Sequence, residues 1–281
     1  MSRMEEILNL AKSVPPFPKV ARRVMELLRD PRTDARSLAE VIQYDQVITA
    51  NVLKICNAPY FGLARKVSSL REALVVLGHE ELKDIIIASS SAKFYQGEVG
   101  AGYALEQGDM WKHSVASGIL AKLLVHKIKD VDAATAFTAG LLHDIGKRFL
   151  SNFVADDFER IMDKVLKEKR SFVEAEKEFL GVNHAELGGV ILKRWGFPTD
   201  IQQAVLHHHD PGAMGREPLT ALVALSNTLV ISMGIGVGAD GLATKMRGEG
   251  LARFGITRAH LDLCMADLFV ELEEVGELLQ L

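Results

Sequence analysis

The sequence of 281 residues lacks the marks of a secreted, fibrous or disordered protein. It contains only two cysteines, Cys56 and Cys264, which give neither a disulfide framework nor a Cys-x-x-Cys pair. Because disulfides are rare where thiols are kept reduced, we expect a cytoplasmic protein. Low-complexity tracts and repeats at a solenoid period are also lacking, and the hydrophobic content of 48% excludes disorder.

A strong charge of one sign is missing too. The chain has 33 Lys and Arg against 37 Asp and Glu, a formal net charge of -4, which argues against a protein dedicated to nucleic acid or to anionic membranes. The N-terminus lacks the charged-then-apolar plan of a signal peptide. Residues 218–239 carry no charge, but Ser226, Asn227 and a glycine-rich end indicate a buried helix that runs into a loop rather than a membrane span.

Helical periodicity dominates the apolar positions. Apolar residues recur at helical spacing, for example at Val20, Val24 and Leu27, whereas no long stretch alternates apolar and polar residues as a half-buried strand would. The sequence therefore predicts an all-α fold. A glycine-rich segment at 96–108 indicates a loop or hinge, so we expect two helical parts, residues 1–95 and residues 96–281.

Histidine is distributed unevenly along the chain. Six of the nine histidines lie in four short pieces of the second part: DMWKH (109–113), LLHDIGK (141–147), GVNHAELG (181–188) and LHHHDP (206–211). A neutral imidazole and a carboxylate, as in the adjacent His143 and Asp144, are ligands that Zn, Mn and Fe(II) accept. Neighbours on a helix diverge by about 100°, so both can reach one metal only where a helix end faces the cavity.

Two further side chains fit the same cavity. Lys147 lies one turn after His143, and its ammonium could contact a phosphate or act as an acid. Asp109 and His113 are four residues apart and therefore share a helix face. In the simpler alternative, each histidine is a hydrogen-bonded core residue and the run 207–209 is a solvated helix end. That alternative requires several motifs to coincide by chance.

The motifs resemble the HD superfamily of metal-dependent phosphohydrolases, named for the His-Asp pair, and more closely the HDOD proteins, the HD-related output domains of bacterial signalling. The first part carries VPPFPKVARRVMELLRDPRTDARSLAEVIQYD and ITANVLKICNAPYFGLARKVSSLREALVVLGHEEL, with the Pro-x-x-Pro, Asn-Ala-x-Tyr-x-Gly and Ser-Leu-Arg-Glu-Ala patterns typical of HDOD. The second part adds WKHS, GLLHDIGK, NHAELG, RWGFP and HHHDP. The resemblance implies an N-terminal helical subdomain packed on an HD-like helical core.

The resemblance also implies a metal site. In catalytic HD proteins the first His, the His-Asp pair and a distal Asp hold the metals, and the related HD-GYP proteins add further histidines. Asp109 stands where some HD-GYP proteins place an extra Glu ligand, and Lys147 matches the lysine of HD-x-x-K. The resemblance implies one or two divalent transition-metal ions, with Fe, Mn, Zn and Ni all left open. Carried over residue by residue, the implied ligands are His113, His143, Asp144, His184, His208 and His209.

Two departures from the family pattern bear on catalysis. Asn227 stands where the distal Asp is expected, and it remains a further candidate ligand. A neutral amide oxygen is a weaker ligand than a carboxylate, so one metal position is short of negative charge. After His208 and His209 the segment DPGAMGREP lacks the Gly-Tyr-Pro triplet, which weakens an assignment as a cyclic di-GMP phosphodiesterase.

The resemblance leaves two main functions open. The first is a bacterial signalling output module without clear catalytic activity, whose partners are other signalling proteins or a small phosphorylated ligand. The second is a metal-dependent phosphohydrolase acting on a nucleotide or a cyclic dinucleotide, in which Asp144 bridges two metals and Lys147 stabilises the phosphate charge. Oxygen chemistry at a di-iron site ranks below both, because nothing in the sequence points to an organic substrate. We expect no nucleic-acid or membrane partner, and the oligomeric state is left open.

Overall fold

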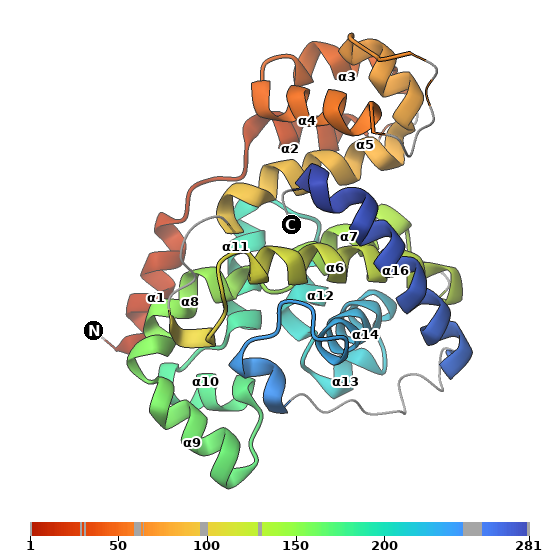
Figure 1. Cartoon of the computed structure of the whole chain (residues 1–281). Coiled ribbons are helices and arrows are strands. Elements are labelled where there is room, and N and C mark those ends of the chain that lie inside the picture. Colours follow the sequence, from red (N-terminus) through yellow and green to blue (C-terminus); the bar gives the residue numbers. More distant parts are fainter. Residues whose placement is uncertain are drawn as a thin grey trace. The chain divides into compact units, whose positions relative to one another are not determined.

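The structure is a computed structural model that describes residues 2–28, 30, 32–58, 63, 65–95, 101–128, 131–243 and 255–279 (Figure 1). Across those residues the secondary structure is helical and contains no strand, which confirms the all-α prediction. The chain divides into two compact units. We call residues 1–15 with 94–269 the core unit, and residues 16–93 with 270–281 the small unit.

The boundary between the units lies inside α5 (Leu70–Tyr95), between Lys93 and Phe94. It is close to the boundary after residue 95 that the sequence predicts. The first helix, α1 (Arg3–Ser13), clusters with the core unit, where it contacts α8 (Ile145–Asp156) and α11 (His184–Trp195). That residues 1–95 and 96–281 are separate domains stays a prediction.

The small unit begins its helices with aspartate caps. Asp34 accepts a hydrogen bond from a backbone N–H one turn into α3 at 2.8 Å, and Asp45 does the same for α4 at 3.1 Å. The side chain of Asn57 closes the following loop, with hydrogen bonds of 2.7 Å to both the N–H and the O of Val67. With most of α5, the helices of this unit are α2 (Lys19–Leu27), α3 (Ala35–Ile42) and α4 (Gln46–Cys56).

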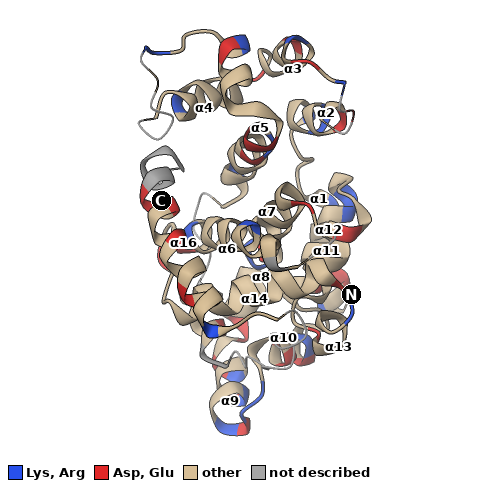
Figure 2. Cartoon of the chain, turned by 90° about the vertical axis from the view of Figure 1, so that its right-hand side faces the viewer, with Lys and Arg blue, Asp and Glu red and all other residues tan. Residues whose placement is uncertain are grey.

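The core unit carries the histidine motifs. The helices α7 and α14 contain no charged residue; they pack on each other and on α6, and their residues are mostly buried. Figure 2 shows α14 in tan, whereas α9 is marked by charged residues. After α1, its helices are α6 (Asp109–Leu124), α7 (Ala133–Leu142), α8 (Ile145–Asp156), α9 (Phe158–Glu168), α10 (Phe172–Leu180), α11 (His184–Trp195), α12 (Thr199–His207), α13 (Pro211–Met214), α14 (Pro218–Ser232) and the first part of α16 (Arg258–Leu279), with 3-10 turns η2 (Ala101–Tyr103), η3 (Val125–Lys127) and η4 (Ala239–Ala243).

The uncharged segment at 218–239 forms the buried helix α14 and the start of a loop, as the sequence predicts. In the part of the chain that the structure describes, no helix is long and apolar enough to cross a membrane.

The close approach of α8 to α11 depends on Gly146. A Cβ atom at this position would lie 1.9 Å from the backbone O of His184 and 2.9 Å from the backbone N of Gly188. Only a residue without a side chain fits such a contact. Because Asp144 precedes α8 and His184 begins α11, this contact brings the two motifs together.

Candidate metal centre

Helix ends carry most of the residues that the sequence analysis selected. His143 directly follows α7 and Asp144 directly precedes α8, so the pair occupies the junction between two helices. His184 is the first residue of α11, and His208 directly follows α12. His113 is the exception and lies inside α6. At this junction, where α7 ends and α8 begins, the adjacent His143 and Asp144 can both face one cavity.

The carboxylate of Asp144 is surrounded by four imidazole rings. Its Oδ2 lies 3.1 Å from Nε2 of His143 and 3.7 Å from Nε2 of His113. Its Oδ1 lies 3.4 Å from Nε2 of His184 and 3.7 Å from Nε2 of His208. All five residues are at most 4% exposed. Each oxygen of the carboxylate therefore faces its own pair of histidines.

The potential ligand atoms of this His/Asp cluster fall into two groups that share Asp144. A carboxylate that presents one oxygen to each group has the geometry of a bridge between two metal ions. His209 is less buried than the others, and its Nε2 lies 3.0 Å from Nε2 of His184. The first group is His113, His143 and Asp144, the second is Asp144, His184, His208 and His209, and the ligand atoms of each group lie within 4.8 Å of one another.

Backbone carbonyls determine which ring nitrogen faces the carboxylate. Nδ1 of His143 lies 2.7 Å from the O of Gly140, and Nδ1 of His208 lies 2.7 Å from the O of Val205. A carbonyl oxygen only accepts, so Nδ1 donates the proton and Nε2 of the neutral ring is an acceptor. Among the described residues, neither of these Nε2 atoms nor Oδ1 of Asp144 has a hydrogen-bond partner.

These unpaired acceptors point to a cation. Leaving a buried polar group without a partner costs about 1–3 kcal/mol, and such groups are rare in native proteins. Here three acceptors, Nε2 of His143, Nε2 of His208 and Oδ1 of Asp144, converge in one buried place. Metal ions accept electron pairs from such atoms, and His143 belongs to the first group while His208 belongs to the second, so the residues present fit a metal site.

Glu176, which the sequence analysis missed, orients His184. Its Oε2 accepts the backbone N–H of His184 at 3.1 Å and lies 2.7 Å from Nδ1, while Oε1 accepts the hydroxyl of Tyr103. Glu176 is fully buried on the apolar stripe of α10, four residues after Phe172 and four before Leu180. An acid inside an apolar stripe is the signal that could have identified it, because Glu is almost never fully buried without a partner.

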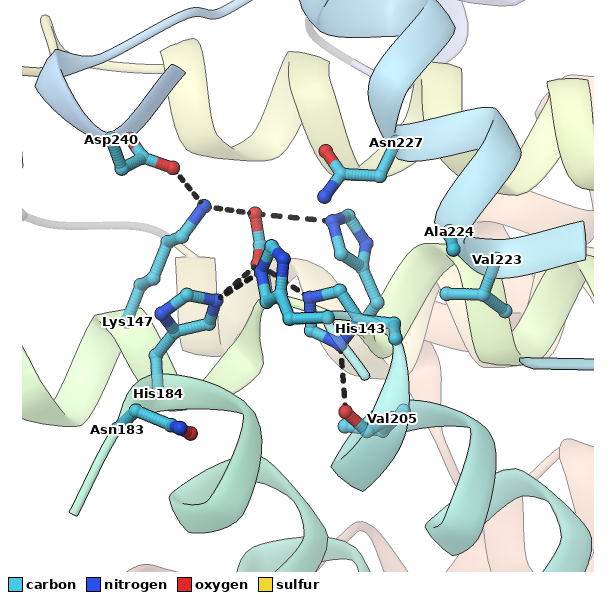
Figure 3. Close-up of polar contacts among 12 residues, drawn as sticks. His143, Lys147, Asn183, His184, Val205, Val223, Ala224, Asn227 and Asp240 are labelled. Carbon is cyan, nitrogen blue, oxygen red and sulfur yellow. Dashed lines mark hydrogen bonds and ion pairs between the residues drawn. The ribbon is translucent and has the colours of Figure 1, made fainter. Parts of the chain in front are cut away.

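The buried ammonium of Lys147 lies between two carboxylates. It pairs with Asp144, and its Nζ lies 2.6 Å from Oδ2 of Asp240 (Figure 3). Asp240 belongs to η4 and is a second residue that the sequence analysis missed. Together with His113, these three residues line a pocket of about 270 Å³ of empty space, which includes space open to solvent. A ligand that enters this pocket reaches both the cluster and the ammonium.

Neighbouring charges keep Asp144 and Lys147 ionised. Burial opposes the charged form of Asp144, but neighbouring groups, among them the ammonium of Lys147, outweigh it and hold the pKa of the carboxyl well below its usual range. Burial likewise opposes the charged form of Lys147, yet Asp144 and Asp240 raise its pKa above the usual value. The pair therefore supplies one negative and one positive charge at neutral pH.

Burial keeps three of the histidines neutral. It lowers the pKa of His113 to about 4, and together with neighbouring histidines it lowers the pKa of His208 and of His209 well below the usual range. Neutral imidazole is the form that binds metals. His184 differs, because Glu176 outweighs the effect of burial and raises its pKa.

The two additional candidate ligands, Asn227 and Asp109, are placed differently. Oδ1 of Asn227 lies 3.1 Å from Nε2 of His113, so the amide reaches the edge of the first group. The carboxylate of Asp109 instead accepts the backbone N–H of Glu106 at 2.9 Å. Asp109 is not a member of either group of potential ligand atoms.

An all-helical core that presents a His, a His-Asp pair, a second His and a double His around one buried carboxylate defines the class of this chain as an HD-related helical protein. The HDOD domain family matches residues 14–211, which is more than half of the chain. The chain belongs to this family.

Solved structures share the fold over nearly the whole chain. An HDOD domain protein of unknown function from Geobacter sulfurreducens is 25% identical, with a TM-score of 0.74 over 98% of this chain and 97% of that chain. A protein of Shewanella amazonensis SB2B, provisionally described as a phosphohydrolase, is 21% identical, with a TM-score of 0.70 over 97% of this chain and 96% of that chain. The second likeness shows a shared fold.

Curated relatives are longer proteins. An uncharacterized protein of Treponema pallidum (strain Nichols) is 21% identical over 232 residues, which are 80% of this chain and 43% of that protein. Ribonuclease Y of Thermus thermophilus (strain ATCC 27634) is 32% identical over 100 residues, which are 36% of this chain and 12% of that protein. The chain therefore spans less than half the length of these relatives.

Proposed function

We propose that this chain is a bacterial, cytoplasmic HDOD signalling module whose core unit binds two divalent transition-metal ions at the His/Asp cluster. The convergence of the unpaired acceptor atoms of His143, His208 and Asp144 carries the metal proposal. Membership of the HDOD family supports the signalling role. Its partners are then other signalling proteins or a small phosphorylated ligand that enters the pocket beside Lys147.

The two groups of ligand atoms define two metal positions. The three-ligand position uses His113, His143 and Oδ2 of Asp144, and the four-ligand position uses Oδ1 of Asp144 with three further histidines. Imidazole and carboxylate ligands suit Fe, Mn, Zn and Ni alike. Asn227 stands beside the three-ligand position as a neutral amide, so this position has less negative charge than a carboxylate would give it.

Elemental analysis of protein purified without a histidine tag tests the metal proposal. We expect about two equivalents of metal per chain for two such positions. His143→Ala should lose metal, because it removes one ligand of the three-ligand position and a direct neighbour of the Asp144 carboxylate. His126→Ala is the matched control, since His126 is exposed in η3 and should leave the metal content unchanged. Sub-stoichiometric metal that does not respond to His143→Ala would contradict the proposal.

Hydrolysis of a phosphate ester is the second candidate function, and the placement of Lys147 favours it. The ammonium lines the same pocket as Asp144, where it can donate to a phosphate oxygen. Metals at the cluster would supply a water of lowered pKa and positive charge against the phosphate. Asp144 would bind both ions through its two oxygens, and His113 would line one side of the pocket.

A screen of phosphomonoesters, nucleotides and cyclic dinucleotides with added Mn(II) or Fe(II) distinguishes the two functions. An enzyme should show turnover that disappears in Asp144→Asn, which removes the bridging charge and keeps the shape. A metal-loaded protein without turnover on any of these substrates supports the non-catalytic signalling module.

A further inference from the structure

The pocket at the cluster already contains an anion that the protein itself supplies. Oδ2 of Asp240 lies 2.6 Å from Nζ of Lys147, and the Asp240 side chain is 11% exposed. Figure 3 shows Asp240 and Lys147 pointing toward one another across this end of the site. Both residues line the pocket. The ammonium that a phosphate would contact is therefore engaged by an internal carboxylate.

A tightly seated segment holds Asp240 in this position. Residues 233–241, which we call the glycine segment, follow α14, and the carbonyl of Ile235 accepts a hydrogen bond from Nδ1 of His113 at 3.1 Å. A Cβ at Gly236 would lie 2.2 Å from the backbone O of Asp109, and a Cβ at Gly238 would lie 2.3 Å from the backbone O of Tyr103. The segment thus lies directly on the backbone of the core unit.

Phosphate and carboxylate oxygens compete for the same donor. A lysine ammonium binds either of them through charge-assisted hydrogen bonds. Lys147 has two carboxylate partners, Asp144 and Asp240. If Asp144 bridges metals, Asp240 is the partner left on the ammonium.

We infer that Asp240 is a specificity-determining residue that occupies the oxyanion position at Lys147, so that a phosphoryl ligand binds this pocket only by displacing it. This inference rests on the proposed function in so far as the phosphorylated ligand enters the pocket beside the metal positions. The ligand class is a phosphate mono- or diester. Its binding moves the carboxylate of Asp240, and with it the glycine segment, away from Lys147.

Calorimetric titration with orthophosphate tests the inference, with the metal content of every sample measured in parallel. Asp240→Asn keeps the shape of the side chain and removes its charge, so we expect phosphate to bind about tenfold more tightly or better than to the wild type. Asp262→Asn is the matched control: it removes an exposed carboxylate that pairs with Arg258 on α16, and phosphate binding should stay at the wild-type level. Adding Lys147→Gln to Asp240→Asn should abolish the gain.

A second variant displaces Asp240 without changing it. Gly238→Ala places a Cβ against the O of Tyr103, which forces the glycine segment off the core unit, and phosphate should again bind more tightly. Gly215→Ala is its control, because a Cβ there meets its nearest atoms at 3.6 and 3.7 Å, which is ordinary contact. This pair decides the question even if Asp240→Asn folds poorly.

The outcomes separate this inference from the proposed function. Phosphate binding that is equal to the wild type or weaker in both Asp240→Asn and Gly238→Ala overturns the inference. Loss of metal in Asp240→Asn overturns it as well, since Asp240 would then be a metal ligand rather than a competitor for Lys147. A wild type without metal refutes the metal proposal, whereas phosphate binding in Asp240→Asn with and without Lys147→Gln is measured separately and decides the inference.

Discussion

Nδ1 of His184 lies 2.7 Å from Oε2 of Glu176, and both residues are fully buried. The other ring nitrogen, Nε2, faces Asp144 at 3.4 Å. A carboxylate behind a histidine ligand fixes the orientation of the ring and raises its basicity toward a metal. Glu176 is therefore a positioning residue that acts through His184.

Glu176→Gln should weaken metal binding at the four-ligand position by about 10–100-fold, the usual effect of losing such an outer carboxylate. Competition against a chelator of known affinity measures this change. Glu178→Gln, which alters a more exposed glutamate on the same helix, serves as the control and should bind metal as the wild type does. Unchanged affinity in Glu176→Gln would show that the ring of His184 needs no carboxylate to hold it.

The two proposed metal positions should differ in affinity, and Asn227→Asp should reduce the difference. The three-ligand position has fewer ligands, and its neighbour Asn227 carries no charge. An added carboxylate 3.1 Å from His113 raises the ligand charge at that position, so we expect the weaker of two affinity classes to tighten roughly tenfold or more. A calorimetric titration with Mn(II) resolves the two affinity classes.

Asn152→Asp is the control for this change, because it adds the same charge at an exposed site on α8. It should leave both classes unaltered. A single affinity class in the wild type, or a weaker class that does not respond to Asn227→Asp, would contradict the assignment of Asn227 to the three-ligand position.

The spacing of motifs was enough to select the residues that converge on Asp144, and three of the four motifs place a histidine at a helix end. It was not enough to predict side-chain direction. Asp109 and His113 share a helix face by spacing, yet the carboxylate of Asp109 accepts the N–H of Glu106, a local backbone donor in the turn before the helix.

Residues whose roles depend on tertiary packing were not predictable from spacing. Glu176 matters because α10 buries it against His184, and Asp240 matters because the glycine segment returns to Lys147. The helical periodicity predicted the all-α fold, but not that α1 clusters with the core unit, because its contacts are with α8 and α11, far along the chain. Such long-range contacts leave no periodic signal in one sequence.

The metal-free protein should lose stability as the pH falls from about 6.5 toward 4. Burial lowers the pKa of His113 from 6.5 to about 4, so the unfolded chain takes up the proton first on acidification. This contribution to the free energy of unfolding is present above pH 6.5 and reaches roughly 3 kcal/mol. His208 and His209 act in the same direction, whereas the raised pKa of His184 opposes it.

Urea unfolding of chelator-treated protein at several pH values measures this dependence. His113→Gln should flatten the profile, because a glutamine side chain does not titrate. His126→Gln alters an exposed histidine and should keep the wild-type slope. A wild-type profile that is level between neutral and mildly acidic pH would be inconsistent with neutral, buried histidines.

Gly146→Ala should separate the two halves of the metal centre. The added Cβ would lie 1.9 Å from the O of His184, so α8 and α11 must move apart, at a cost of about 1–3 kcal/mol in the free energy of unfolding. Because Asp144 precedes α8 and His184 begins α11, the four-ligand position should weaken more than the three-ligand position, whose His143 is bound to Asp144 along the chain.

Chemical unfolding and Mn(II) titration measure these two effects of Gly146→Ala. Gly215→Ala, where a Cβ meets only ordinary contacts at 3.6 Å or more, should change neither. If Gly146→Ala lowered stability but weakened both positions equally, the contact between α8 and α11 would support the core unit as a whole rather than the distance from Asp144 to His184.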